Sequence, residues 1–220
     1  MTTRAATRFI VVRHGETEWN VAGRVQGHKD SPLTARGLAQ AEALADRLAR
    51  ERFDALVASD LGRALKTAAA IGARSALEVM PDPRVRERSF GEGEGLDYDE
   101  IDRRWPDVFI RTGTTDPDRA IPGGETRRQF HERVRAAFVA LASEHAGRRV
   151  AVVSHGGVVA ALYRIVHDIP LAHAHRIAIS NASYNAVVYD HAVALDGNAW
   201  ALEAWDDTAH LPEATPFAES

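Results

Sequence analysis

Two histidines follow short apolar runs that lie far apart in the chain. His14 comes after residues 9–13 and His155 comes after residues 150–154, and each histidine precedes a glycine. A neutral imidazole is a good nucleophile near neutral pH, and a neighbouring glycine lets a phosphate approach the backbone closely. Because ligands bind at the carboxyl ends of strands in α/β sheets, two adjacent strands would bring both histidines into one pocket.

Two arginines lie where they could bind an anion held by these histidines. Arg13 directly precedes His14, and Arg63 lies at the start of a predicted helix. A guanidinium binds oxyanions through two donors, and a helix N-terminus attracts negative charge. Each of these residues has a purely structural alternative when it is considered alone. A histidine at a strand end can cap a backbone carbonyl, and an arginine can lie on the surface in solvent. The combination is what indicates a phosphoryl site.

A carboxyl group could supply the acid–base chemistry of such a site. Glu87 lies among arginines and just before the glycine-rich stretch 91–95, where Glu92 and Glu94 offer the same chemistry. The residues alone do not choose among the three. Two arginines and two histidines can balance the charge of a transferring phosphoryl group, so the site is expected to need no metal and no other cofactor.

Helices alternate with strands along the chain, which predicts an α/β sandwich with a mainly parallel sheet. Strands are expected over 8–12, 53–58, 77–80 and 149–154, and helices over 35–51, 61–73, 97–105, 125–145 and 157–167. Residues 184–190 and 199–205 alternate as an antiparallel hairpin at the edge of the sheet. Residues 15–33 and 81–124 are rich in glycine and proline and are expected to be loops.

Local signals set the expected ends and faces of several helices. Thr34 is predicted to cap the helix over 35–51, and Ser59 or Asp60 the helix over 61–73. Helical spacing puts two apolar stripes on single faces: Leu38, Ala41, Ala45 and Leu48 in the first helix, and Phe130, Val134, Phe138 and Leu141 in the helix over 125–145. The stripe in the helix over 125–145 is expected in the core.

Five sequence blocks in this order carry a family resemblance. Residues 13–17 read Arg-His-Gly-Glu-Thr, residues 59–64 Ser-Asp-Leu-Gly-Arg-Ala, residues 86–91 Arg-Glu-x-x-Phe-Gly, residues 122–125 Pro-Gly-Gly-Glu and residues 154–157 Ser-His-Gly-Gly. The chain resembles the histidine phosphatase superfamily, the phosphoglycerate-mutase-like group, over about residues 8–210. One departure is Gly93, which precedes Glu94 where members of this family often have an aromatic residue.

The resemblance implies a three-layer α/β/α fold and a phosphohistidine intermediate. His14 would be the nucleophile, and Arg13, Arg63 and His155 would hold the phosphoryl oxygens. The resemblance also selects Glu87, which would protonate the leaving oxygen and then activate water. The residues expected to border the substrate are Asn20, Gln26, Gly27 and Gly156.

Three activities are compatible with this resemblance. A phosphoglycerate mutase carries a longer insertion after the catalytic glutamate than residues 88–124 provide here. We therefore expect a phosphomonoester hydrolase acting on a small phosphorylated metabolite, with the mutase as the alternative. A non-catalytic binding protein is a third possibility, although the core residues of the site are all present. Broad-specificity, α-ribazole and sugar-phosphate phosphatases all stay open as the particular type.

The composition is that of a soluble globular protein. The 220 residues suit one domain, 45% are hydrophobic and 26% are charged. The net charge of −4 gives no general case for nucleic acid or an anionic membrane as a partner. The absence of cysteine excludes disulfides, and with no apolar leader or span a cytoplasmic location is expected. The edge hairpin leaves a homodimer and a monomer both open.

Overall fold

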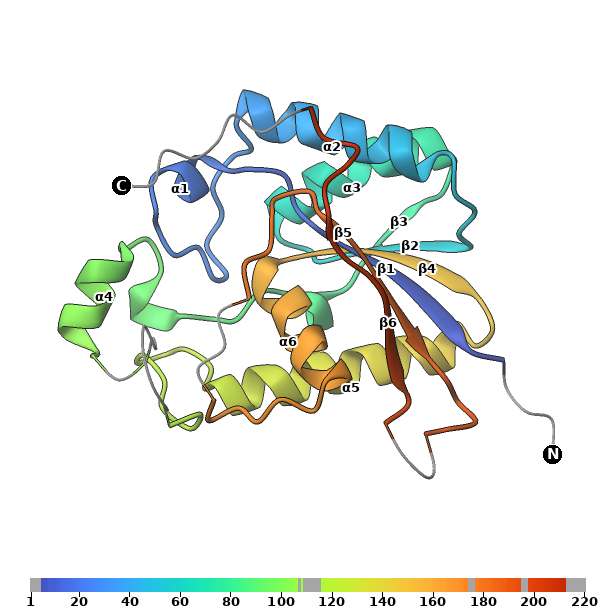
Figure 1. Ribbon diagram of the computed structural model, residues 1–220. Helices are drawn as coiled ribbons and strands as arrows, with labels where there is room; N and C mark the ends of the chain where they lie inside the picture. The colour runs from blue at the N-terminus through green and yellow to red at the C-terminus, as the bar shows by residue number, and fades with distance from the viewer. Residues whose placement is uncertain (1–4, 107, 109–115, 174–176, 195–197, 213–220) are drawn as a thin grey trace.

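A six-stranded sheet forms the centre of the protein (Figure 1). The computed structural model describes residues 5–106, 108, 116–173, 177–194 and 198–212. The strands are β1 (Thr7–Arg13), β2 (Ala55–Ala58), β3 (Val79–Pro81), β4 (Arg149–Ser154), β5 (Tyr184–Tyr189) and β6 (Trp200–Asp207). Their order across the sheet is β3-β2-β4-β1-β5-β6. The last strand of the parallel part, β4, is therefore inserted between β1 and β2.

The directions of the strands confirm a mainly parallel sheet with an antiparallel edge. β4 runs parallel to both β1 and β2, and β3 runs parallel to β2. β5 is antiparallel to β1, and β6 is antiparallel to β5. The predicted hairpin at the edge of the sheet is thus confirmed. Since the parallel strands all end on one side, the residues that follow β1, β2 and β4 meet there.

Helices cover both faces of this sheet, which confirms the three-layer arrangement (Figure 1). The helices are α1 (Glu18–Val21), α2 (Ala35–Leu48), α3 (Gly62–Ser75), α4 (Tyr98–Arg104), α5 (Arg127–Glu144) and α6 (Gly156–Val166). Helices α2 and α3 cover one face, and α5 and α6 cover the other. The described part of the chain holds no helix with the length and apolar character that crossing a bilayer requires.

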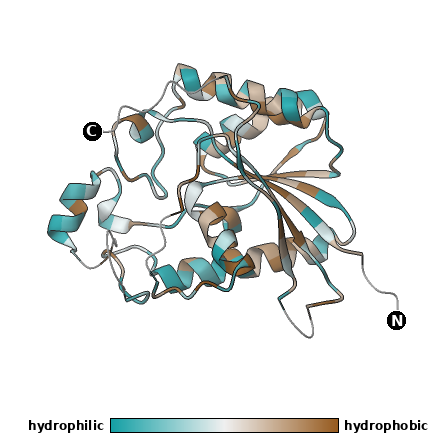
Figure 2. Cartoon of the chain, in the orientation of Figure 1, coloured by the Kyte–Doolittle hydropathy of each residue, from teal (hydrophilic) through white to brown (hydrophobic). Residues whose placement is uncertain are grey.

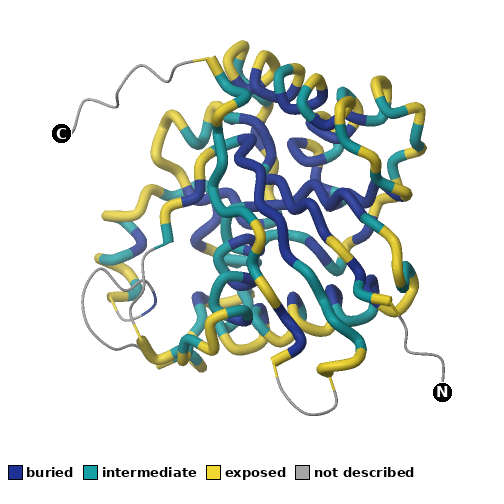
Figure 3. Tube along the Cα trace, turned by 45° about the vertical axis from the view of Figure 1, so that its right-hand side comes forward, coloured by how far each residue is buried: buried dark blue, intermediate teal, exposed yellow. Residues whose placement is uncertain are grey.

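The core consists of two apolar clusters, one on each face of the sheet. In β1, Phe9 and Val11 pack with α5 and α6, whereas Ile10 and Val12 pack with α2 and α3. Successive strand residues point to opposite faces, so a strand buried on both faces reads as an unbroken apolar run. Figure 2 shows this apolar sheet between helices with polar outer faces, and Figure 3 shows that its central strands are buried.

The local signals were mostly correct, with two exceptions. Thr34 caps α2, since its side chain accepts a hydrogen bond from the Gly37 N–H. Leu38, however, is 43% exposed, and Leu44 occupies the buried face of α2 in its place. The predicted cap of α3 was also wrong: the helix begins after Leu61, without a side-chain cap. The Ser59 hydroxyl is engaged elsewhere, as described below.

The two segments expected to be mostly loops, residues 15–33 and 81–124, each contain a short helix. The helix expected over 97–105 is confirmed as α4, whereas α1 was not predicted. In the first segment, Thr17 and Asn20 form a reciprocal capping box that begins α1. The second segment contains α4 and two 3₁₀ turns, Pro83–Val85 and Gly91–Gly93. A third apolar cluster joins the two segments and consists of Val25, Ile101, Val108 and Ile121. Together they cover the side of the sheet where the parallel strands end (Figure 1).

Candidate active site

The ends of β1 and β4 place the two histidines side by side. Arg13 pairs with Ser154 in the parallel ladder, and the His14 N–H donates to the Ser154 carbonyl at 3.0 Å. His14 and His155 each follow one of these strand ends directly. Their ring centroids are 5.3 Å apart and the rings are inclined at 61°. The sheet therefore brings together two side chains that lie far apart in the sequence.

The hydrogen bonds of His14 determine which of its ring nitrogens can react. Nδ1 lies 2.8 Å from the Gly15 carbonyl oxygen, which can only accept, so Nδ1 carries the proton. Nε2 accepts a hydrogen bond from Nε of Arg63 at 3.3 Å and carries the lone pair. Burial, together with Arg63 and Arg13, lowers the pKa of His14 well below its ordinary value. The ring is thus a neutral imidazole whose unprotonated nitrogen is Nε2.

Arg63 fixes the segment after α1 beside this nitrogen. Its guanidinium donates to the carbonyl oxygens of Gly27 at 2.8 Å and Lys29 at 2.9 Å, and it forms an ion pair with Asp30 at 3.0 Å. The side chain is buried at the N-terminal turn of α3, where the helix adds positive potential. Burial lowers the pKa of Arg63, yet a guanidinium stays charged at neutral pH. A buried positive charge therefore lies next to Nε2 of His14.

A cavity of about 270 Å³ opens in front of His14. The predicted site residues that line it are Arg13, His14, Asn20, Gln26, Gly27, Arg63, Glu87 and Gly156. Of the predicted set, only His155 is not among the lining residues; it is fully buried, with its ring centroid 5.3 Å from that of His14. Other lining residues include Arg24, Tyr98 and Gly157. The structure thus gathers the predicted residues around one concave site, as expected for a binding pocket.

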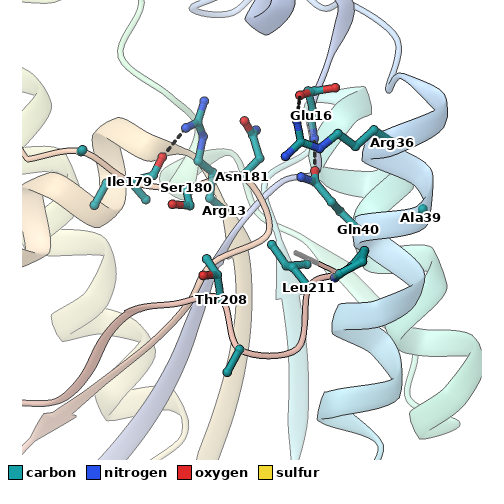
Figure 4. A pocket seen from close by; sticks show the side chains of 13 residues that line it. Arg13, Glu16, Arg36, Ala39, Gln40, Ile179, Ser180, Asn181, Thr208 and Leu211 are labelled. Carbon is teal, nitrogen blue, oxygen red and sulfur yellow. Dashed lines mark hydrogen bonds and ion pairs between the residues drawn. The ribbon is translucent and has the colours of Figure 1, made fainter. Parts of the chain in front are cut away.

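Arg13 lies between this cavity and a second, larger one. The guanidinium donates through Nη1 to the Ile179 carbonyl, and its buried Nε has no partner among the described residues (Figure 4). On its other side, a cavity of about 700 Å³ is lined by Arg13, Glu16, Arg36, Gln40, Asn181 and neighbouring residues (Figure 4). Burial lowers the pKa of Arg13. The unpartnered Nε–H leaves Arg13 able to donate to a bound oxyanion.

Glu87 is the one of the three candidate glutamates that lines the cavity. Its Oε1 accepts from the Arg88 N–H at 2.8 Å, and its Oε2 accepts from the Gly157 N–H at 3.0 Å. A Cβ at position 157 would lie 2.0 Å from Oε1 of Glu87, so only glycine permits this approach. Glu92 is exposed, and Glu94 is buried among backbone donors. The carboxyl group of Glu87 is therefore held in place by two backbone N–H groups.

Asn20, Gln26 and Gly27 line the cavity from the segment after β1. Asn20 accepts through Oδ1 from the Thr17 N–H, which completes the capping box of α1. Gln26 is 8% exposed, and its Oε1 has no partner among the described residues. Gly27 has a φ of +55°, a conformation that disfavours other residues. The unpartnered amide oxygen of Gln26 can accept a hydrogen bond from a bound molecule.

Four polar residues support the site through hydrogen bonds that the sequence did not predict. The Asn181 amide donates to the His14 carbonyl and to Oδ1 of Asn20, each at 3.1 Å. Thr67 accepts from the Gly15 N–H at 3.1 Å. The remaining two are Ser59, which contacts His155, and Glu94, which accepts from the His28, Lys29 and Phe90 N–H groups. Ser59, Thr67 and Glu94 are buried polar side chains, and no local spacing reveals that burial.

The departure from the family pattern at Gly93 has a packing reason. A Cβ at this position would lie 2.6 Å from Cδ1 of Ile121, in the third apolar cluster. Gly93 is buried, and Phe90 rather than residue 93 contributes an aromatic ring to the lining of the cavity. An aromatic side chain at residue 93 is therefore excluded by Ile121 in this protein.

The fold and this arrangement of residues define a class of enzymes that transfer phosphoryl groups, and sequence comparison identifies the family. The profile of the histidine phosphatase superfamily (branch 1) matches residues 9–208. The chain belongs to this superfamily.

Relatives of this chain carry two kinds of name. The "Metal-independent phosphoserine phosphatase" of Arabidopsis thaliana is 38% identical over 208 residues, which cover 93% of this chain and 83% of that protein. The "Phosphoglycerate mutase-like protein 4" of the same plant is 36% identical over 216 residues, covering 96% and 90%. The chain is thus similar to proteins named as phosphatases and as mutases.

A solved structure supports the same relationship. The mycobacterial glucosyl-3-phosphoglycerate phosphatase, in complex with VO3, matches with a TM-score of 0.78 and 31% sequence identity. The match covers 91% of this chain and 99% of that one. The fold is therefore shared over nearly the whole of both chains.

Proposed function

We propose that this protein is a metal-independent phosphomonoester hydrolase that acts through a phosphohistidine on a small phosphorylated metabolite. The observation that carries the proposal is the state of His14: a buried, neutral imidazole whose Nε2 lone pair lies beside Arg63 and at a cavity. A nucleophile with its charge-balancing partners already in position needs little reorganisation as the reaction proceeds.

The first half-reaction would form the phosphoenzyme. Nε2 of His14 attacks phosphorus, and the bond between phosphorus and the ester oxygen breaks. Glu87, as a carboxylic acid, gives its proton to that oxygen, which leaves as an alcohol. Arg13, Arg63 and His155 stabilise the charge that spreads over the remaining phosphoryl oxygens.

The second half-reaction would release phosphate. The Glu87 carboxylate takes a proton from a water molecule, and the oxygen of that water attacks phosphorus. The bond between phosphorus and Nε2 breaks, and His14 returns to its neutral state. Two backbone N–H groups hold the carboxyl group of Glu87 in one position. A fixed position suits both steps, because the same carboxyl group must act first as an acid and then as a base.

The test is release of inorganic phosphate in the presence of EDTA, using p-nitrophenyl phosphate, phosphoserine, 3-phosphoglycerate and a panel of sugar phosphates. We expect release by the unaltered protein and none by His14→Ala. His167→Ala is the matched control, since His167 is an exposed histidine outside the cavity. Trapped phosphoprotein that is stable to base and labile to acid would identify the phosphohistidine.

Two results would contradict the proposal. Full turnover by His14→Ala would exclude His14 as the nucleophile. Absence of phosphate release, together with interconversion of 2- and 3-phosphoglycerate in a coupled assay, would instead identify a mutase. The relative named as mutase-like makes that second assay necessary.

A further inference from the structure

Ser59 makes a short contact with His155 that the proposed mechanism does not use. Ser59 follows the end of β2, and its N–H donates to the Val153 carbonyl at 2.9 Å. Its Oγ lies 2.7 Å from Nε2 of His155, and both residues are fully buried. Two adjacent strand ends therefore hold this hydroxyl against the imidazole ring.

The acceptors near the Ser59 hydroxyl determine the direction of this hydrogen bond. Oγ accepts from the Leu61 N–H at 3.4 Å, and a hydroxyl oxygen can accept and donate at the same time. Among the described residues, Nε2 of His155 is the one acceptor in reach of the buried hydroxyl proton, so the hydroxyl donates to Nε2. Burial, with Arg63 and His14 nearby, lowers the pKa of His155 well below its ordinary value, so the ring is neutral. A neutral ring that accepts at Nε2 must carry its proton on Nδ1.

Nδ1 of His155 is a buried polar atom without a partner among the described residues. A buried N–H group that lacks an acceptor is costly, and proteins keep such groups chiefly at functional sites. The ring stands 5.3 Å from that of His14, where the phosphoryl group would be carried. A phosphoryl oxygen is the acceptor that this N–H lacks.

We infer that Ser59 is a positioning residue that holds His155 in its Nδ1–H tautomer, so that Nδ1–H donates to an oxygen of the phosphoryl group on His14. The identity of the acceptor, a phosphoryl group on His14, rests on the proposed function. The hydrogen bond between Ser59 and His155 does not depend on the proposed function, so the role of Ser59 and the phosphatase activity can be tested separately.

The first measurement is the tautomer of His155 in the unaltered protein without substrate. Long-range proton–nitrogen correlation spectra of protein labelled with ¹⁵N-histidine distinguish the two ring nitrogens, and His155→Gln assigns the signals. We expect the protonated type of signal at Nδ1 and the unprotonated type at Nε2. A proton on Nε2 would overturn the inference, whatever the enzymatic activity.

The second measurement compares Ser59→Ala with Ser154→Ala. Ser154 is a matched control because it is equally buried and its hydroxyl donates to the Val85 carbonyl at 2.8 Å, not to a histidine. We expect kcat of Ser59→Ala to fall about 10- to 100-fold, as is usual when a partner that orients a functional histidine is removed. KM should change little, since the lost interaction acts on the transferring group.

The His155 spectrum distinguishes a positioning role from a merely structural one, because a merely structural role would leave the tautomer of His155 unchanged. In Ser59→Ala the Nδ1–H pattern should weaken in favour of Nε2–H, whereas Ser154→Ala should keep the original pattern. Equal kcat in the two variants, or an unchanged tautomer in Ser59→Ala, would refute a positioning role. If the unaltered protein releases no phosphate, the proposed function fails while the tautomer measurement still decides the role of Ser59.

Discussion

Nε of Arg63 lies 3.3 Å from Nε2 of His14, and the rest of the same guanidinium holds the carbonyl oxygens of Gly27 and Lys29. One side chain therefore contacts the unprotonated nitrogen of His14 and also holds the segment that lines the cavity. A change at Arg63 is expected to affect both the chemistry and the stability of the protein.

Replacement of Arg63 by lysine keeps the positive charge, so it tests whether the losses of activity and stability come from the donors of the guanidinium and not from its charge. Lysine keeps one positive charge but lacks the planar set of donors, so it cannot serve His14, Gly27 and Lys29 together. We expect kcat/KM for phosphate release to fall by roughly 100-fold or more, with a lower Tm. Arg74→Lys, in the same helix and at an exposed ion pair, is the control and should be nearly neutral. Equal activities of the two variants would argue against the role of Arg63.

Glu87→Gln should affect substrates according to their leaving groups. Glutamine keeps the size of the side chain but cannot donate a carboxylic proton. Release of phosphate from phosphoserine should fall about 10²- to 10⁴-fold. The first step with p-nitrophenyl phosphate should suffer less, because nitrophenolate leaves without protonation, and pre-steady-state release of nitrophenol measures it. An equal loss of that first step with both substrates would contradict proton donation by Glu87.

Gly157→Ala should also prevent proton donation by Glu87, because it displaces the Glu87 carboxyl group. The new Cβ would lie 2.0 Å from Oε1 of Glu87, so the carboxyl group must move. We expect a loss of kcat comparable to that of Glu87→Gln, with the fold retained. Because both changes disable one group, the double variant should lose little more than either single variant. Additive losses in this double-mutant cycle would show that Gly157 acts through something other than Glu87.

The two buried histidines should make stability fall at mildly acidic pH. Burial, followed by nearby arginines, lowers the pKa of both His14 and His155 well below the ordinary value of 6.5. Below pH 6.5 the unfolded chain therefore binds protons that the folded chain does not, and unfolding becomes easier as pH decreases. For each histidine the slope approaches about 1.4 kcal/mol per pH unit well below pH 6.5, and it is about half of that at pH 6.5.

Urea unfolding at pH 7.5, 6.5 and 5.5 checks this expectation. The carboxyl groups with lowered pKa values, such as Asp60 and Glu125, start from ordinary values of 3.8 and 4.5 and act mainly below this window. The double variant His14→Gln/His155→Gln should show a shallower decrease than the unaltered protein between pH 6.5 and 5.5. Parallel curves for the two proteins would mean that these histidines are not held neutral by the fold.

Much of the fold follows from patterns that are local in the chain. β4 was predicted over its observed bounds because residues 149–154 form an apolar run between turn signals. Long α5 was predicted because Phe130, Val134 and Phe138 recur at helical spacing on one buried face. Leu38 was wrongly placed on the buried face of α2, where it is in fact 43% exposed. Its spacing puts it at the margin of the apolar stripe, and only the packing of α2 against the sheet decides which residues of the helix are buried.

The site residues that directly follow a strand or begin a helix could be predicted from the sequence. His14, Arg13 and His155 belong to such positions, and the structure places them together. Glu87 could be selected over Glu92 and Glu94 only by the family resemblance, since three carboxyl groups in one irregular segment look alike in sequence. Ser59 and Asn181 contact the histidines through turns whose conformation no periodicity encodes.

The position of β4 has a consequence for how this protein becomes active during synthesis. β1 pairs with β4 and β5, which are made late, and β4 separates it from β2. A nascent chain that ends before β4 carries His14 on a strand without its ladder partners. The ribosome must therefore deliver most of the polypeptide before any phosphoryl chemistry can begin, and a truncated chain should be inert rather than weakly active.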